Sequence, residues 1–155
     1  PLSPNAEAVQ TKVYELEVLQ EAADKVRAMA GSWTNSSTRN VYEAVMDGKT
    51  FIARNKNNFV IRAVLDGGSL EGTVTVPALK GWTDNDCWTP EYTVPVAGKV
   101  AADMRSISLQ YMENRYNASF WRITGSGTNN TGHTNGECSG VTLTGSAPTD
   151  IVLVR

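Results

Sequence analysis

The feature that most constrains this chain is a change of hydrophobic period about thirty residues from its start. Up to that point apolar side chains recur at spacings of three and four, which is the pattern of one helix face. The series is Val9, Val13, Leu16, Leu19, Ala23, Val26 and Ala30. Ser3 or Asn5 can cap the start, and Gly31 tolerates the conformation that ends a helix. We therefore predict a helix over about residues 5–30, which is roughly 37 Å long at 1.5 Å per residue.

Beyond Gly31 the pattern becomes that of β-structure. Residues 31–40 are polar and predict a connecting loop, whereas Asp47-Gly48 and Asp66-Gly67-Gly68 are turn sequences between alternating segments. We expect a single domain over residues 1–155, with the antiparallel sheet region at 41–155. The predicted fold class is α+β, in which the long amphipathic helix packs on the sheet and one disulfide joins the C-terminal region.

Charge and hydropathy exclude two classes of partner. Lys and Arg number 14 and Asp and Glu number 16, which gives a net charge of −2 with both signs interspersed. Without a basic stripe the sequence predicts no nucleic-acid binding. No run approaches the roughly 18 apolar residues that span a bilayer. These residues therefore predict no membrane span.

Two cysteines allow one intramolecular disulfide. A bond between Cys87 and Cys138 closes a loop of 138 − 87 = 51 residues, and it stabilises the fold by about 4 kcal/mol in the chain-entropy model. The alternative is two buried free thiols in a reducing compartment. Segments rich in Ser, Thr and Asn favour secretion. The sequons at Asn35, Asn117 and Asn129 leave modification open, since such triplets are frequent in Asn-rich loops.

The chain has little that predicts catalysis. The single histidine, His133, has Cys138 nearby but too few further ligands for a zinc site. Asp84-Asn85-Asp86 begins like a calcium loop, but Trp88 and Pro90 stand where that loop needs ligands. No nucleophile, phosphate-binding or dinucleotide motif is present. We therefore predict no catalytic, cofactor-binding or metal-binding residues and no enzymatic activity. The alternative is that two carboxylates far apart in the sequence meet in the fold and act as acid and base.

Aromatic residues in the second half of the chain have two interpretations. They either hold a loop against the sheet or line a face that binds a sugar or another ligand. The residues concerned are Trp82, Trp88, Trp121, Tyr92, Tyr111 and Tyr116.

The order of parts resembles the soluble portion of a type IV pilin. The resemblance depends on the long helix that ends at Gly31-Ser32-Trp33, the polar loop, the sheet and the region closed by Cys87 and Cys138, whose spacing is similar to that of type IVb pilins. It implies a structural subunit of an extracellular bacterial filament, a fimbrium that serves cell adhesion by self-assembly and contact with a host or surface receptor. It also implies a disulfide between the two cysteines and a hydrophobic half-helix before Pro1, which anchors the subunit in the inner membrane before assembly.

Two alternatives come from other classes of protein. Gly31-Ser32-Trp33 also resembles the Gly-x-Trp that opens the first strand of lipocalin-like barrels, and the chain ends in a strand with a terminal Arg155 as some of those barrels do. That resemblance implies a carrier of a small apolar ligand in a barrel mouth. A heptad-bearing helix followed by a β-rich region also fits a trimeric fibre tip with receptor-binding loops.

Overall fold

The structure is a computed structural model that describes residues 3–80, 87–121 and 137–155. One helix, α1 (Pro4–Ala28), precedes the strands. In chain order these are β1 (Gly31–Asn35), β2 (Val41–Asp47), β3 (Thr50–Asn55), β4 (Val60–Asp66), β5 (Ser69–Val76), β6 (Leu79–Lys80), β7 (Trp88–Thr89), β8 (Tyr92–Val100), β9 (Ser106–Trp121) and β10 (Glu137–Val154). The residues expected to be a connecting loop thus contain β1, followed by the turn at 36–40.

The main sheet is a closed antiparallel barrel in the order β1-β10-β9-β8-β5-β4-β3-β2. Successive strands are neighbours, and pairing of β1 with β10 closes the ring at Thr34↔Val154. Both expected turns join adjacent strands, with Gly48 at φ 59° and Gly67 at φ 62°, a backbone conformation that glycine adopts at low cost. Strands β6 and β7 form a separate two-stranded sheet.

Side chains fill the interior of the barrel. Burial alternates along the strands, as in β4, where Ile61, Ala63 and Leu65 are buried and the residues between them are exposed or half-buried. The largest fully buried side chains are those of Trp33, Phe51, Met29, Ile61, Leu70, Ile107, Leu153 and Val74. They form one hydrophobic core, so this small barrel is packed with its own side chains.

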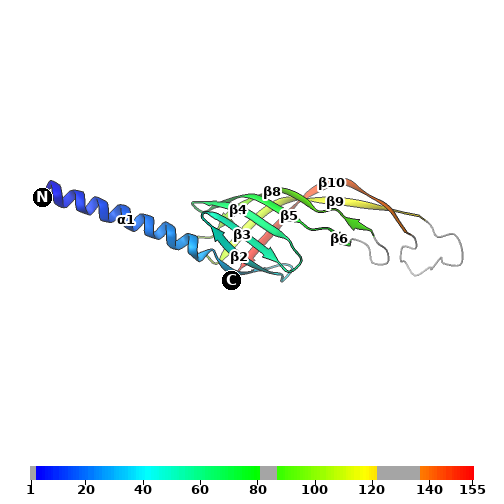
Figure 1. Ribbon diagram of the computed structural model, residues 1–155, viewed down its shortest axis with the longest axis horizontal. Coiled ribbons are helices and arrows are strands. Elements are labelled where there is room, and N and C mark those ends of the chain that lie inside the picture. Colours follow the sequence, from blue (N-terminus) through cyan, green and yellow to red (C-terminus); the bar gives the residue numbers. More distant parts are fainter. Residues whose placement is uncertain (1–2, 81–86, 122–136) are drawn as a thin grey trace.

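The expected α+β fold, with the helix packed on the sheet, is wrong. The protein is mostly β, and α1 projects from one end of the barrel without burying any of its residues (Figure 1). Ser3 caps the helix by accepting a hydrogen bond from the Ala6 amide at 3.3 Å, and only Val26, near the other end, packs against the core. Periodicity indicates that one face of the helix is apolar, but it does not indicate what covers that face. It therefore cannot place the helix on the sheet. Within the described part of the chain, no helix has the length and hydropathy needed to cross a membrane.

At the barrel end next to α1, which we call the closed end, residues that follow the helix contact the residue that follows β10. The Trp33 ring is fully buried and donates a hydrogen bond from Nε1 to the Met29 carbonyl at 2.9 Å. The Arg155 guanidinium lies 4.0 Å from the centre of the same ring, a cation–π contact. Arg155 also donates to the carbonyls of Met104 and Ala30. The Gly31-Ser32-Trp33 motif and Arg155 thus contact each other at this end of the barrel.

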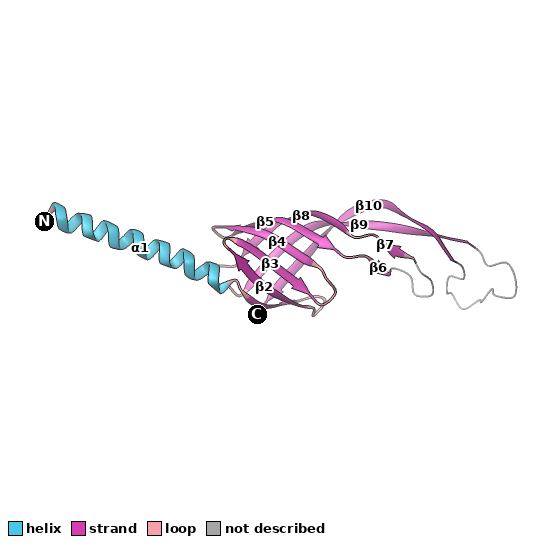
Figure 2. Cartoon of the chain, in the orientation of Figure 1, coloured by secondary structure: helices cyan, strands magenta, loops and turns pink. Residues whose placement is uncertain are grey.

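At the opposite end, β9 and β10 continue beyond the other strands as a long hairpin (Figure 2). Their pairing extends from Val154↔Ser106 in the barrel to Glu137↔Trp121, with register shifts at Cys138/Gly140 and Leu143/Gly145. Cys87, immediately before β7, and Cys138 in β10 form a disulfide with a Cα–Cα distance of 5.1 Å. This bond joins the β6–β7 segment to the long hairpin.

Candidate binding site at the barrel mouth

Strands β8 and β9 separate at the barrel end opposite to α1, which we call the mouth. They pair from Val100↔Ile107 to Val96↔Tyr111. Residues Tyr92–Pro95 of β8 then stay paired with β5, while β9 continues with β10. Proline has no backbone N–H to donate, so Pro95 cannot extend the β8–β9 ladder through its nitrogen. Beyond Val96↔Tyr111, β8 and β9 are therefore no longer bonded to each other along the sheet.

A pocket of about 390 Å³ lies on the mouth side of this separation. Its lining combines apolar and aromatic side chains with polar ones, the usual composition of a small-ligand site. The lining residues are Phe59, Val76, Leu79, Thr89, Tyr92, Glu113, Asn114, Arg115 and Tyr116. They come from β5, β6, β7, β8 and β9 and from the turn before β4.

Tyr92 connects the two separated strands. Its hydroxyl accepts a hydrogen bond from the backbone N–H of Asn114 at 3.1 Å. The Tyr92 and Tyr116 ring centres lie 6.2 Å apart with an angle of 52° between their planes. The Asn114 side-chain amide donates to the Tyr116 hydroxyl at 3.0 Å. Each hydroxyl therefore accepts a bond from Asn114 and keeps its own O–H as a donor.

A second set of polar contacts links alternate residues of β9. The Tyr111 hydroxyl donates to Glu113 Oε2 at 3.2 Å, and Glu113 Oε1 forms an ion pair with Arg115 at 3.1 Å. Because alternate residues of a strand lie on the same face, Tyr111, Glu113 and Arg115 form one row and Asn114 and Tyr116 belong to the other. Both rows reach the pocket, since Glu113, Arg115, Asn114 and Tyr116 all line it.

Three tyrosines at this end of the barrel, Tyr42, Tyr92 and Tyr111, have a raised pKa and are therefore protonated at neutral pH. Burial raises the pKa of Tyr111 above its ordinary value, and the Glu113 carboxylate raises it further. Burial also raises the pKa of Tyr42 and of Tyr92, and the hydrogen bond from the Asn114 backbone N–H offsets part of the rise at Tyr92. The site thus offers uncharged hydroxyl donors beside a paired carboxylate and guanidinium.

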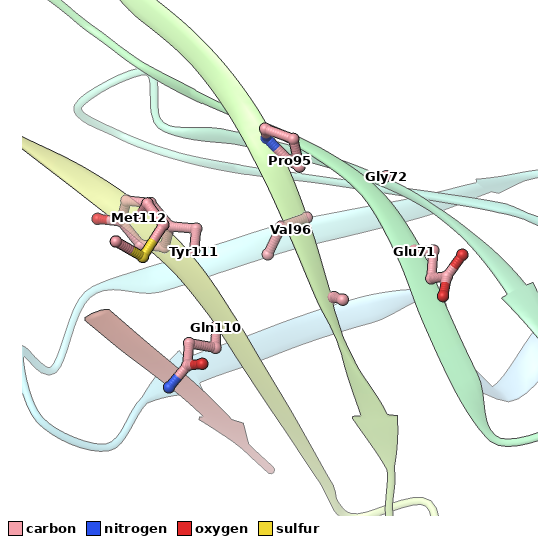
Figure 3. Close-up of a pocket in the computed structure, with 8 residues that line it drawn as sticks. Glu71, Gly72, Pro95, Val96, Gln110, Tyr111 and Met112 are labelled. Carbon is pink, nitrogen blue, oxygen red and sulfur yellow. The ribbon is translucent and has the colours of Figure 1, made fainter. Parts of the chain in front are cut away.

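A further hollow of about 560 Å³ lies on the outer face of the same separation. Figure 3 shows Pro95 and Val96 on β8, Tyr111 and Met112 on β9 at one side of it, and Glu71 on β5 at the other side. Val96 and Tyr111 are buried, whereas Met112 is 47% exposed. Tyr111 therefore lies between the outer hollow and the Glu113 row of the mouth pocket.

Two buried asparagines shape the rim of the mouth. The Asn55 side-chain oxygen accepts the amides of Asn57 at 2.9 Å and Phe59 at 3.1 Å, which fixes the turn that carries Phe59 to the pocket. The Asn35 oxygen accepts the amides of Ser37 and Thr38 in the same way. Because Asn35 is only 6% exposed, the folded protein does not present this sequon for glycosylation.

The disulfide holds one wall of the pocket in place. Leu79 pairs with Thr89, whose hydroxyl donates to the Leu79 carbonyl at 3.2 Å. Cys87 is fully buried and lies two residues before Thr89. Its bond to Cys138 therefore fixes both Leu79 and Thr89 relative to β10.

The structure brings together three of the six aromatic residues that the sequence singled out. Tyr92 and Tyr116 line the mouth pocket and Tyr111 lies beside it. Trp88 is 53% exposed and forms none of the pocket lining. Trp82, His133, Asn129 and Asp84-Asn85-Asp86 lie outside the described residues, as does the side chain of Trp121.

Sequence reasoning missed Phe59, Glu113, Asn114 and Arg115 as pocket residues. The available signal was the segment Tyr111–Tyr116, which has a tyrosine at each end and the consecutive polar residues Glu113, Asn114 and Arg115 between them, beyond the core residues Ile107 and Leu109 of the same strand. Nothing in the sequence indicated that β8 would leave β9 at this segment. Over the described residues, no cluster of His, Cys, Asp and Glu is suited to hold a metal ion.

Comparisons with models of protein families, with curated proteins and with solved structures find no match to this chain.

Proposed function

We propose that this protein is a binding module that holds a small saccharide at the mouth of its barrel. The observation that carries the proposal is the pair of Tyr92 and Tyr116 rings, 6.2 Å apart, beside the Glu113–Arg115 ion pair in a pocket of about 390 Å³. Aromatic rings with nearby carboxylate, amide and hydroxyl groups suit a ligand that has one apolar face and many hydroxyls.

The chemistry of the pocket favours an uncharged ligand. Glu113 already pairs with Arg115, so a charged ligand would compete with an existing ion pair. The Tyr92 and Tyr116 hydroxyls can donate to ligand oxygens, and the Asn114 amide and the Glu113 carboxylate can bond ligand hydroxyls. A sugar ring can place its C–H face on a tyrosine ring and direct its hydroxyls to these groups.

The packed interior supports a ligand that stays at the mouth. Tyr42 and Tyr111 are buried, and below them the core holds bulky side chains such as Phe51 and Trp33. A long apolar ligand would have to displace these side chains, which costs free energy in a close-packed core. The apolar carrier suggested by the lipocalin-like motif is therefore the second candidate.

Calorimetric titration with methyl glycosides of glucose, galactose, mannose and N-acetylglucosamine tests the proposal. For the roughly 13 non-hydrogen atoms of a methyl hexoside at about 0.3 kcal/mol each, which gives about 4 kcal/mol, we expect a Kd on the order of 1 mM for the preferred sugar. Tyr116→Ala should remove this binding because it deletes one ring and the partner of Asn114. Tyr14→Ala is the matched control, since Tyr14 is 68% exposed on α1.

The two candidate ligand classes predict opposite results. Binding of palmitate, with no heat from any glycoside, would contradict the saccharide proposal and support the apolar carrier. Glycoside binding that Tyr116→Ala leaves unchanged would place the sugar elsewhere on the chain, and would also contradict it.

Assembly into an extracellular adhesive filament stays a prediction from the sequence. It was tied to a helix packed on the sheet, and that packing is wrong. The disulfide supports an oxidising, extracellular location for the binding module.

A further inference from the structure

Helix α1 carries a row of large apolar side chains that the rest of the described chain leaves uncovered. Val9 is 62% exposed, Val13 48% and Leu16 53%. They lie four and three residues apart, so they form one stripe along the helix. A 25-residue helix in water gains most of its stability from covering such a stripe.

The side of α1 that faces the barrel is opposite to this stripe. A groove of about 410 Å³ separates α1 from the closed end of the barrel, and the α1 residues Val18, Ala22 and Lys25 line it. At about 100° per residue, Val9, Val13 and Leu16 point roughly 180° away from this groove. The barrel therefore neither covers the stripe nor obstructs access to it.

The spacing of the stripe fits the seam of a coiled coil. In heptad notation, Val13 and Gln20 occupy a positions, and Val9, Leu16 and Ala23 occupy d positions. A β-branched residue at a with leucine at d favours two strands, and a polar residue at a fixes the register. This seam ends at Ala23, before the helix reaches the barrel.

Charges beside the seam select the orientation. Lys12 occupies a g position and Glu17 the e position that faces it from the next helix in a parallel pair. Lys12 is well exposed and contacts only Glu15 of its own helix, at 4.0 Å. An antiparallel pair would instead set e positions against e positions, so Glu17 would not face Lys12.

From the exposed stripe and this charge complementarity we infer that α1 pairs in parallel with α1 of a second copy of this chain. Parallel pairing places both barrels at the same end of the helices and directs both mouths away from the seam. The inference does not depend on what the mouth binds, but it would make any binding module bivalent.

Sedimentation equilibrium of the chain with its disulfide intact tests the pairing. We expect a concentration-dependent mass that reaches two chains, and a dissociation constant that Leu16→Glu raises by more than about tenfold. Tyr14→Glu is the control, because Tyr14 is exposed on the same helix but lies off the seam. Circular dichroism of each variant shows whether the barrel is still folded.

A charge exchange tests the orientation. Lys12→Glu and Glu17→Lys should each weaken the dimer, and the double variant should restore it, because only parallel pairing sets these two positions against each other. A monomer at every concentration, or a dimer insensitive to Leu16→Glu, would overturn the inference. A dimer that the double variant fails to restore would overturn its parallel orientation.

Discussion

At the scale of single residues, side chains far apart in the sequence fix the two ends of the barrel. Arg155 covers Trp33 at the closed end, and Tyr92 bonds the Asn114 backbone at the mouth. Tyr92 joins β8 and β9 where their backbones no longer pair, and Arg155 adds side-chain contacts next to the Thr34↔Val154 pair that closes the ring. Substitutions at these positions should therefore affect stability more than their partial exposure suggests.

Replacing Arg155 by alanine should destabilise the closed end. The substitution removes the cation–π contact with Trp33 and the side-chain hydrogen bonds to Met104 and Ala30, and we expect it to cost about 1–3 kcal/mol. Urea unfolding measures the loss, and the Trp33 emission should shift to longer wavelength as water reaches the ring. Arg54→Ala, at an exposed position of β3, should change stability by less than about 0.5 kcal/mol. Equal effects of the two variants would contradict a stabilising role for the contacts of Arg155 with Trp33, Met104 and Ala30.

The raised pKa of Tyr111 predicts a loss of stability at alkaline pH. Below the unfolded-state pKa of 10.0 both states are protonated and the stability is fully present. As the pH rises above that value, the unfolded state releases its proton first. The free energy of unfolding should then fall by up to about 1.4 kcal/mol per pH unit for this residue. Urea unfolding between pH 8 and 11 in about half-unit steps checks this. Tyr111→Phe should show a shallower decline, and a steeper one would contradict the assignment.

Among the elements of the barrel, two pairs of neighbouring strands approach each other more closely than a side chain at the point of contact would allow. A Cβ added at Gly98 in β8 would lie 1.8 Å from the Ser108 carbonyl oxygen of β9, and one at Gly72 in β5 would lie 1.9 Å from that of Arg62 in β4. Both contacts are with backbone atoms, which cannot rotate away. These two glycines thus allow the approach that precedes the separation of β8 and β9 at the mouth.

Gly98→Ala should therefore destabilise the barrel by about 1–3 kcal/mol, because β9 must shift to admit the methyl group. Gly140→Ala is the matched control, since a Cβ there meets nothing within 4 Å. Thermal unfolding of both variants provides the comparison. An unchanged midpoint for Gly98→Ala would show that the strands are farther apart than described.

Removing the disulfide should affect both stability and the mouth. Cys87→Ala with Cys138→Ala opens a loop of 51 residues, and we expect a loss of up to about 4 kcal/mol. Because Cys87 is outside the barrel core, the variant should still fold, with a lower midpoint. It should also bind glycosides more weakly, since Leu79 and Thr89 lose their anchor. Unchanged glycoside affinity in the folded variant would contradict the role given to β6 and β7.

At the scale of the whole molecule, the sequence predicted local structure better than arrangement. The helix and the turns at Gly48 and Gly67 follow from short-range patterns, and the structure has them close to where they were expected. Closure of the sheet depends on Thr34 meeting Val154, a contact between the two ends of the β region that no local pattern encodes. The covering of the helix was misjudged for the same reason.

The binding site likewise combines residues that local patterns predict with residues that only the tertiary arrangement brings to the pocket. Tyr92, Tyr111 and Tyr116 could be named from composition because aromatic residues among polar ones are unusual in a loop-rich region. Phe59 could not, because the turn fixed by Asn55 brings it to the pocket from a different hairpin. Glu113 and Arg115 carry no local signal of a binding site, because their place in the pocket depends on where β8 leaves β9.

The most direct test of the central claim is a map of amide chemical shifts during titration with the preferred methyl glycoside. We predict perturbations concentrated at Phe59, Leu79, Tyr92, Asn114 and Tyr116, with the amides of α1 unchanged. Perturbations confined to α1 or to strands β2 and β3, or none at millimolar sugar, would contradict a saccharide site at the barrel mouth.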